Sequence, residues 1–251
     1  MMDPKLKSLL VSLADEYETA SFIDGDPSQF MHKVKGANNK EATAFVASSL
    51  SFGARSQFLP KVQRLLDCAK GDMDRWIRSG AFEKDVPNDA SRCFYRFFTF
   101  ETMNGFLRAY KALMEAHGTL GGYVRKECGG DALKAVQAIC GWFSSRGPNA
   151  VVPKDAKSAC KRVCMFLRWM VRDDSPVDIG LWSGFIDKST LVMPLDTHVV
   201  QEALALGLLS SPCASMCAAR RLTSALLEAF PGDPCRGDFA LFGYGVSKDG
   251  K

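Results

Sequence analysis

The chain has 251 residues and a formal net charge of +4, with 47% hydrophobic and 24% charged side chains. This is an ordinary globular composition, and it excludes a disordered, collagen-like or low-complexity protein. No apolar run approaches the roughly 18 residues that a membrane span needs, so we expect neither an integral membrane protein nor a membrane partner. The mild positive charge does not by itself imply a partner.

The N-terminal residues 1–7 lack the basic start, apolar stretch and cleavage site of a signal peptide, so the expected location is the cytoplasm. The nine cysteines form no CxxC pair, and only three histidines accompany them. Cys93, Cys140, Cys160 and Cys164 fall within apolar helical patterns, where a free thiol acts as a small hydrophobic group. We therefore expect no disulfide framework, no metal and no cofactor.

Helical periodicity dominates the chain, and strand signals are scarce. Pro60 is placed near the start of one expected helix, and Gly207 just after the end of another. The predicted helices cover residues 5–18, 40–52, 58–69, 72–80, 91–98, 102–116, 119–127, 131–144, 158–172, 178–187, 197–206 and 214–229. The expected fold is all-α: a single globular unit, 1–251, of two interlocked helical lobes around a central cleft, with a turn-rich joint near 144–157.

A basic segment follows this joint. Residues 153–172 carry six basic side chains against one acid, Asp155: Lys154, Lys157, Lys161, Arg162, Arg168 and Arg172. Helical phasing places Lys161, Arg168 and Arg172 on one face and an apolar stripe with Phe166 on another. Such a basic edge is suited to phosphate binding, and the alternative is a solvated charged face.

Lys161 is the candidate nucleophile of this segment. With Ser158 as N-cap, Lys161 lies in the first helical turn, where the partial positive charge favours a neutral amine. The basic neighbours Lys157 and Arg162 act in the same direction. A neutral lysine amine can attack a sugar C1′ or a carbonyl and form a Schiff base. The alternative is a lysine that only faces solvent.

The second candidate element is residues 193–200, Met-Pro-Leu-Asp-Thr-His-Val-Val. Asp196 stands at an N-cap position before the apolar run that begins at Val199. Its carboxylate could satisfy helix amides and still face a cleft, or it could be a cap alone. His198 is a candidate phosphate or base contact, and the alternative is a packed, hydrogen-bonded histidine.

These two elements together resemble the helix-hairpin-helix DNA glycosylases. A lysine at a helix start followed by Pro-Leu-Asp-Thr-His is similar to endonuclease III-like members, and the spacing is closer to the archaeal 8-oxoguanine glycosylase branch. Residues 41–57 are similar to the early helix and turn of that superfamily, near its DNA-intercalating loop. The stretches 41–57, 166–172, 194–199 and 238–246 also resemble a bacterial family of conserved proteins of unknown function, over nearly the whole chain. The hairpin itself differs, because 152–157 contains no glycine.

The first resemblance implies a role for each matching residue. Lys161 would be the nucleophile, with Lys157 as the other candidate, and Asp196 would stabilise positive charge on the sugar while a flipped base leaves. The implied DNA contacts are Lys154, Lys157, Arg162, Arg168, Arg172, His198, Arg55 and Gln57. The implied base pocket is Trp169, Trp182, Asp178 and Asp238, for which core packing, capping and salt bridging are the alternatives.

The expected function is therefore a DNA repair enzyme: a DNA glycosylase acting on a damaged base, with 8-oxoguanine as the candidate lesion, and with or without an abasic-site lyase step. Its partner would be duplex DNA, and a monomer is favoured. Two alternatives stand beside it, a non-catalytic nucleic-acid-binding helical module and a helical protein-interaction adaptor.

Overall fold

The computed structural model describes residues 2–146 and 150–245. Within them it has thirteen α-helices, two 3₁₀-helices, one π-helix and one two-stranded antiparallel sheet. The protein is therefore mostly helical, in agreement with the predicted all-α class. The chain divides into two compact units, each described here by itself. The terminal unit takes the described residues of 1–23, 130–136 and 156–251, and the middle unit those of 24–129 and 137–155.

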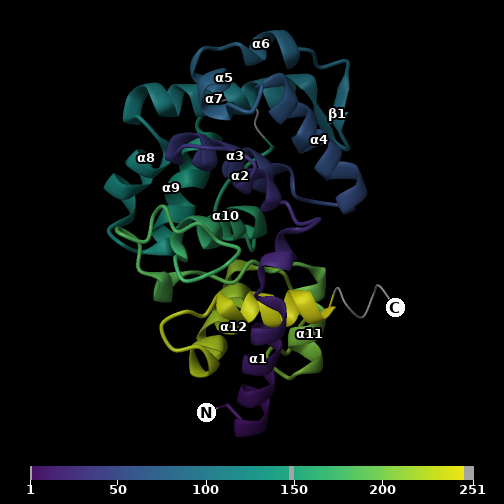
Figure 1. Cartoon of the computed structure of the whole chain (residues 1–251), viewed down its shortest axis with the longest axis vertical. Helices are drawn as coiled ribbons and strands as arrows, with labels where there is room; N and C mark the ends of the chain where they lie inside the picture. Colours follow the sequence, from purple (N-terminus) through teal and green to yellow (C-terminus); the bar gives the residue numbers. More distant parts are fainter. Residues whose placement is uncertain (1, 147–149, 246–251) are drawn as a thin grey trace. The chain divides into compact units, whose positions relative to one another are not determined.

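The middle unit is built around one buried helix, α3, which contacts α2, α4, α5 and α8 (Figure 1). Phe45 on α3 packs against Phe106, Tyr110 and Phe143 in an aromatic core. The elements of the unit are α2 (Gln29–His32), α3 (Ala37–Leu50), α4 (Arg55–Cys68), α5 (Met73–Arg78), α6 (Phe82–Asp85), β1 (Cys93–Tyr95), β2 (Phe98–Thr99), α7 (Phe100–His117), α8 (Leu120–Cys128) and the later part of α9 (Ala132–Ser144).

A buried acid fixes the start of α8 to α3. Glu41 is 6% exposed, and its carboxylate accepts hydrogen bonds from the backbone N–H groups of Leu120 (2.9 Å) and Gly121 (3.1 Å). A carboxylate is stabilised there because the first amides of a helix are unpaired and carry partial positive charge. Glu41 is thus a structural residue of the middle unit.

In the terminal unit, the first helix packs against the last described segment of the chain. α1 contacts α12, α13 and η3, and Figure 1 shows the purple start of the chain lying on its yellow end. A Cβ on Gly243 would lie 2.5 Å from Tyr17 Cγ, so only glycine allows this close approach. The elements are α1 (Pro4–Tyr17), η1 (Ala20–Ile23), the start of α9, α10 (Lys161–Val171), η2 (Lys188–Thr190), α11 (Thr197–Ala205), α12 (Met216–Ala229), α13 (Arg236–Asp238) and the π-helix η3 (Phe239–Gly243).

The prediction of a helix over 91–98 is wrong, because these residues form the β1–β2 hairpin. Cys93 pairs with Thr99 and Tyr95 with Phe98. Arg96 takes up φ +52°, the left-handed conformation that a tight hairpin turn requires. The aromatic residues on both sides of that turn have high strand propensity, and this outweighs the weak helical pattern.

The prediction of a short helix over 178–187 is also wrong. The backbone N–H groups of Ile179 and Gly180 donate to the carbonyl of Trp169, and that of Trp182 donates to the carbonyl of Met170. The segment therefore satisfies the last, otherwise unpaired carbonyl groups of α10. Gly180 has φ +63° and lies so close to Asp173 that a Cβ would be 2.7 Å from it.

Of two further predictions about helix ends, one is confirmed and one is wrong. Gly207 follows the end of α11 with φ +68°, as predicted. The prediction that Pro60 lies near the start of its helix is wrong, because α4 begins at Arg55 and the proline lies inside it. Residues 236–243, which no predicted helix covers, form α13 and η3.

Candidate active site

Lys161 is the first residue of α10, and a strained residue precedes it. Cys160, not the predicted Ser158, is the N-cap, and it adopts φ +46°, which is uncommon for any residue other than glycine. Ser158 instead forms an isolated β-bridge with Ser215, and the Lys157 carbonyl accepts from the Met216 N–H (3.2 Å). This bridge fixes the chain entering α10 to the start of α12.

Asp196 is the N-cap of α11, as the sequence predicts. Its Oδ1 accepts from the Val199 N–H at 2.8 Å, and its backbone is extended. Its Oδ2 lies 3.5 Å from Lys161 Nζ. The lysine side chain is 32% exposed and the aspartate side chain 14%, so solvent reaches the ammonium while the carboxylate is largely covered. The structure thus brings together the two residues predicted to carry the chemistry.

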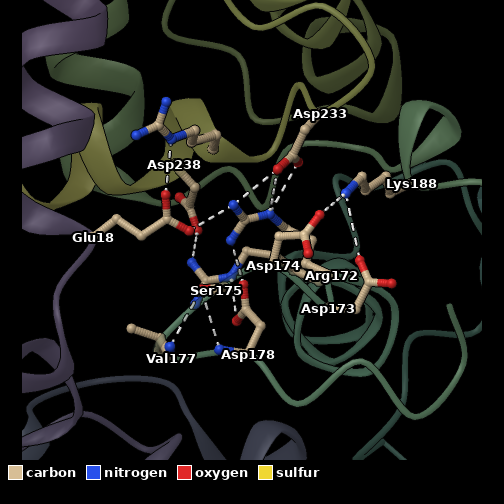
Figure 2. A network of polar contacts seen from close by, with 12 residues as sticks. Glu18, Arg172, Asp173, Asp174, Ser175, Val177, Asp178, Lys188, Asp233 and Asp238 are labelled. Carbon is tan, nitrogen blue, oxygen red and sulfur yellow. Dashed lines mark hydrogen bonds and ion pairs between the residues drawn. The ribbon is translucent and has the colours of Figure 1, made fainter.

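Arg168 and Arg172 do not lie on an exposed basic edge, so their expected role as phosphate contacts is wrong. They are 3% and 2% exposed. Arg168 pairs with Asp178 (3.2 Å) and Asp238, and Arg172 pairs with Asp178 (2.5 Å), Glu18 (2.6 Å) and Asp233 (2.9 Å). Figure 2 shows this network of acids around Arg172. A buried guanidinium surrounded by carboxylates is unavailable to DNA phosphates.

The expected base pocket is likewise part of the core. Trp169 is fully buried, and Trp182 is 2% exposed with its ring edge-on to Phe166 at 5.2 Å. Asp178 and Asp238 are buried ion-pair partners. Burial raises the pKa of Asp178 although Arg168 and Arg172 oppose the shift. Burial, opposed by Arg168 and reinforced by the charge of Asp196, raises the pKa of Asp238 to about 6.

The remaining predicted contacts lie at or near the surface. Lys154, Lys157 and Gln57 are exposed. Burial lowers the pKa of the half-buried Arg162 guanidinium to about 10, so it stays charged at neutral pH. The half-buried His198 ring lies edge-on to Phe242, with centroids 6.0 Å apart. In the middle unit, Arg55 pairs with Asp26 at 3.5 Å.

A family model described as "Protein of unknown function (DUF2400)" matches residues 26–247, most of the chain. The chain belongs to the DUF2400 family. No curated protein and no solved structure gives a match to it. Lys161, Asp196 and Asp238 all lie within the part of this DUF2400 protein that the family model covers.

The β1–β2 hairpin of the middle unit is a candidate binding feature that the helical prediction for 91–98 did not include. Phe97 at its turn is 68% exposed, although it also contacts the rings of Phe52 and Phe98. The guanidinium of Arg96 lies 6.0 Å from the Phe52 ring centroid, and a Cβ on Gly53 would be 2.3 Å from Arg96 Nη1. The sequence pattern that indicates this hairpin is the run of aromatic residues around one arginine at 94–98.

Residues 2–146 and 150–245 offer neither a metal-binding cluster nor a membrane-spanning helix. No group of three or more His, Cys, Asp or Glu side chains is arranged there to hold a metal ion. All nine cysteines of the DUF2400 protein are free thiols. No helix in that part of the chain combines the length and apolar character that a membrane crossing needs.

Proposed function

We propose that this DUF2400 protein is a DNA repair enzyme of the helix-hairpin-helix glycosylase type, acting on a damaged base in duplex DNA. The observation that carries the proposal is the Lys161–Asp196 pair, with Nζ and Oδ2 3.5 Å apart at the starts of two helices. A lysine amine beside a carboxylate is the pair of groups needed to form a Schiff base at a sugar carbon.

The chemistry follows from the two groups. The Lys161 ammonium gives up a proton to solvent, and its amine attacks C1′ of the damaged nucleotide as the bond between C1′ and the base breaks. The base leaves with the bonding electrons and is protonated. The Asp196 carboxylate stabilises the positive charge that develops on the sugar. The C1′–O4′ bond then breaks while O4′ takes up the second amine proton. The product is a protonated Schiff base with an open sugar, from which an abasic-site lyase step can proceed.

The position of Asp196 suits this role. One of its oxygens is held by the Val199 amide, so the carboxylate orientation is fixed before substrate binds. The other oxygen faces Lys161. Such preorganisation is the main source of electrostatic catalysis, because no reorientation is needed during the reaction. The partial exposure of Lys161 leaves the amine within reach of a base flipped out of the duplex.

The hairpin of the middle unit supports a nucleic-acid partner independently. It presents an exposed aromatic ring, Phe97, together with the exposed cations Arg92 and Arg96. An aromatic ring among arginines can stack on an exposed base while the cations attract phosphates. Leu9, Phe97 and Leu181 are the large hydrophobic residues exposed in the described chain, and Phe97 is the most exposed of them.

The test is borohydride trapping and base release on duplexes that carry 8-oxoguanine, uracil or an abasic site. We expect wild type to form a covalent adduct with at least one duplex, and Lys161→Ala to form none. Lys157→Ala is the matched control, because Lys157 lies on the same basic segment and is expected to retain the adduct. An adduct that persists in Lys161→Ala, or the absence of both adduct and base release on every duplex, would overturn the proposal.

The same fold without catalysis is the second candidate, since Asp196 also serves as a helix cap. It predicts salt-dependent duplex binding that is unchanged in Lys161→Ala and Asp196→Asn, with no turnover in any variant.

A further inference from the structure

α12 is hydrogen-bonded to both of the segments that carry the proposed reacting pair. The Met216 N–H at its start donates to the Lys157 carbonyl (3.2 Å), four residues before α10 begins. The Thr223 hydroxyl, in the middle of the helix, accepts from the Met193 N–H (3.0 Å), three residues before Asp196. This second hydrogen bond is buried. Both contacts lie within the terminal unit, so α12 holds a defined position beside the pair.

One face of α12 is packed in the core, and the opposite face is exposed and basic. The exposed side chains follow the spacing of a single helical face: Cys217, Arg220, Arg221 and Ser224. Together with Met216 they line an open groove of about 450 Å³, which we call the α12 groove. The only acid of the helix, Glu228, lies one turn beyond the groove and accepts a hydrogen bond from the Met2 N–H. The lining of the groove therefore carries two positive charges and no negative charge.

The two arginines of the groove differ from the ion-paired arginines of the terminal unit. Arg168, Arg172 and Arg236 each pair with at least one acid. Across the part of the chain that the structure describes, by contrast, neither Arg220 nor Arg221 has an ion-pair partner, and both are exposed. An exposed guanidinium without a carboxylate beside it is available to a phosphate group, and its planar fork matches two phosphate oxygens.

The α12 groove lies within reach of DNA bound at the reacting pair. The three residues from Met193 to Asp196 span at most about 11 Å, and Thr223 follows the arginines by less than one helical turn. With about 10 Å for the thickness of the helix, the arginines lie within about 25 Å of Asp196. One strand of duplex DNA carries a phosphate about every 3.4 Å along its axis, so this distance corresponds to about seven nucleotides.

We infer that the α12 groove binds phosphate groups of the DNA strand that reacts at Lys161, with Arg220 and Arg221 as the contacts. Contacts of this kind position a strand without reading its sequence. They supply, from a helix fixed beside the pair, the phosphate binding that the buried Arg168 and Arg172 cannot provide. The inference rests on the proposed function for its ligand, duplex DNA.

The test is equilibrium binding to a duplex that carries a tetrahydrofuran abasic analogue, measured by fluorescence anisotropy at several salt concentrations. This analogue has no leaving group at C1′, so binding is measured apart from the covalent step. Wild type is compared with the groove variant Arg220→Gln/Arg221→Gln. The matched control is Lys5→Gln/Lys7→Gln, which removes the same charge from exposed positions of α1, in the same unit and outside the groove.

We expect the salt dependence of binding to fall in the groove variant only. The slope of log Kd against log salt concentration should decrease in magnitude by about 2, one for each lost phosphate contact. The control should keep the wild-type slope. Arg220→Lys/Arg221→Lys retains both positive charges and should keep the slope as well.

Neutral methylphosphonate linkages, placed one at a time in the abasic strand, then locate the contact. At one or two positions within about seven nucleotides of the abasic analogue, the neutral linkage should weaken wild-type binding by roughly tenfold, the scale of a hydrogen bond to a charged group. At the same positions it should leave binding by the groove variant unchanged, because the partner of that phosphate is already absent.

The outcomes separate the two proposals. An unchanged salt slope in the groove variant, equal sensitivity of wild type and variant to every neutral linkage, or no wild-type binding at low salt would overturn the role of the α12 groove. Covalent trapping at Lys161 together with an unchanged slope would defeat the groove alone. A reduced slope and a located contact, without adduct or base release on any duplex, would defeat the glycosylase proposal alone.

Discussion

The two oxygens of the Asp196 carboxylate have different partners: Oδ1 accepts from the Val199 N–H, and Oδ2 lies 3.5 Å from Lys161 Nζ. One side chain therefore starts a helix and fixes the position of a lysine. These two tasks respond differently to substitution, because the cap needs only an oxygen acceptor whereas the lysine responds to a negative charge.

Substitution of Asp196 should separate stability from activity. Asp196→Asn keeps an acceptor for the Val199 N–H and should change the free energy of unfolding little, whereas Asp196→Ala should lower it by about 1 kcal/mol. Both variants should lose covalent trapping. Urea denaturation and trapping on one preparation make the comparison, and an Asn variant with undiminished trapping would show that the charge is not needed.

Arg172 is predicted to stabilise the fold. Arg172→Ala leaves the buried carboxylates Asp178 and Glu18 with less compensation, and should lower the free energy of unfolding by about 3–5 kcal/mol. The exposed Arg64 is the control, and Arg64→Ala should stay within about 0.5 kcal/mol of wild type. Equal, small losses in urea denaturation would contradict the assignment of Arg172 to a buried network.

Asp238 should also make the free energy of unfolding depend on pH. Burial holds its pKa in the folded protein near 6, above the value of an unfolded chain, so the folded state binds the proton more tightly. The resulting stabilisation is complete at pH values below the pKa of an aspartate in the unfolded chain, about 4, and it is lost as the pH rises towards 6. The stability of wild type relative to Asp238→Asn should therefore fall between these pH values. A difference that is flat or rises with pH in urea denaturation would refute it.

Phe97 is predicted to act in binding and not in folding. Phe97→Ala should leave the free energy of unfolding nearly unchanged, because the ring is 68% exposed. Its loss should weaken binding to a lesion-containing duplex by roughly tenfold, the lower range of base–aromatic stacking. Leu9→Ala, at a residue 43% exposed in the other unit, is the control for fluorescence anisotropy. Equal affinities of all three proteins would exclude a role of Phe97 in stacking.

Local chemistry made part of the site predictable. Asp196 stands directly before an apolar helical run, and a cap depends only on the next three residues, so both its position and the helix start could be read from the sequence. The entry to α10 could not, because it depends on the bridge between Ser158 and Ser215, which are far apart in the chain.

The burial of the arginines on α10 could not be predicted from the sequence for the same reason. Charged residues spaced along a helix indicate a solvated face, but residues 163–171 are buried on every side. The two guanidinium groups, of Arg168 and Arg172, can be buried only because acids from distant segments pair with them. These acids include Glu18, Asp233 and Asp238. Only the tertiary fold could reveal such partners.

The most direct measurement of the central proposal is the site of covalent attachment. Wild-type protein is trapped with borohydride on an abasic-site duplex and digested, and the modified peptide is sequenced by mass spectrometry. We predict a single modified residue, Lys161, with the yield abolished in Asp196→Asn. Attachment at Lys157 or Lys154 with Lys161 unmodified, or no modified peptide at all, would contradict the assignment of Lys161 and Asp196 as the reacting pair.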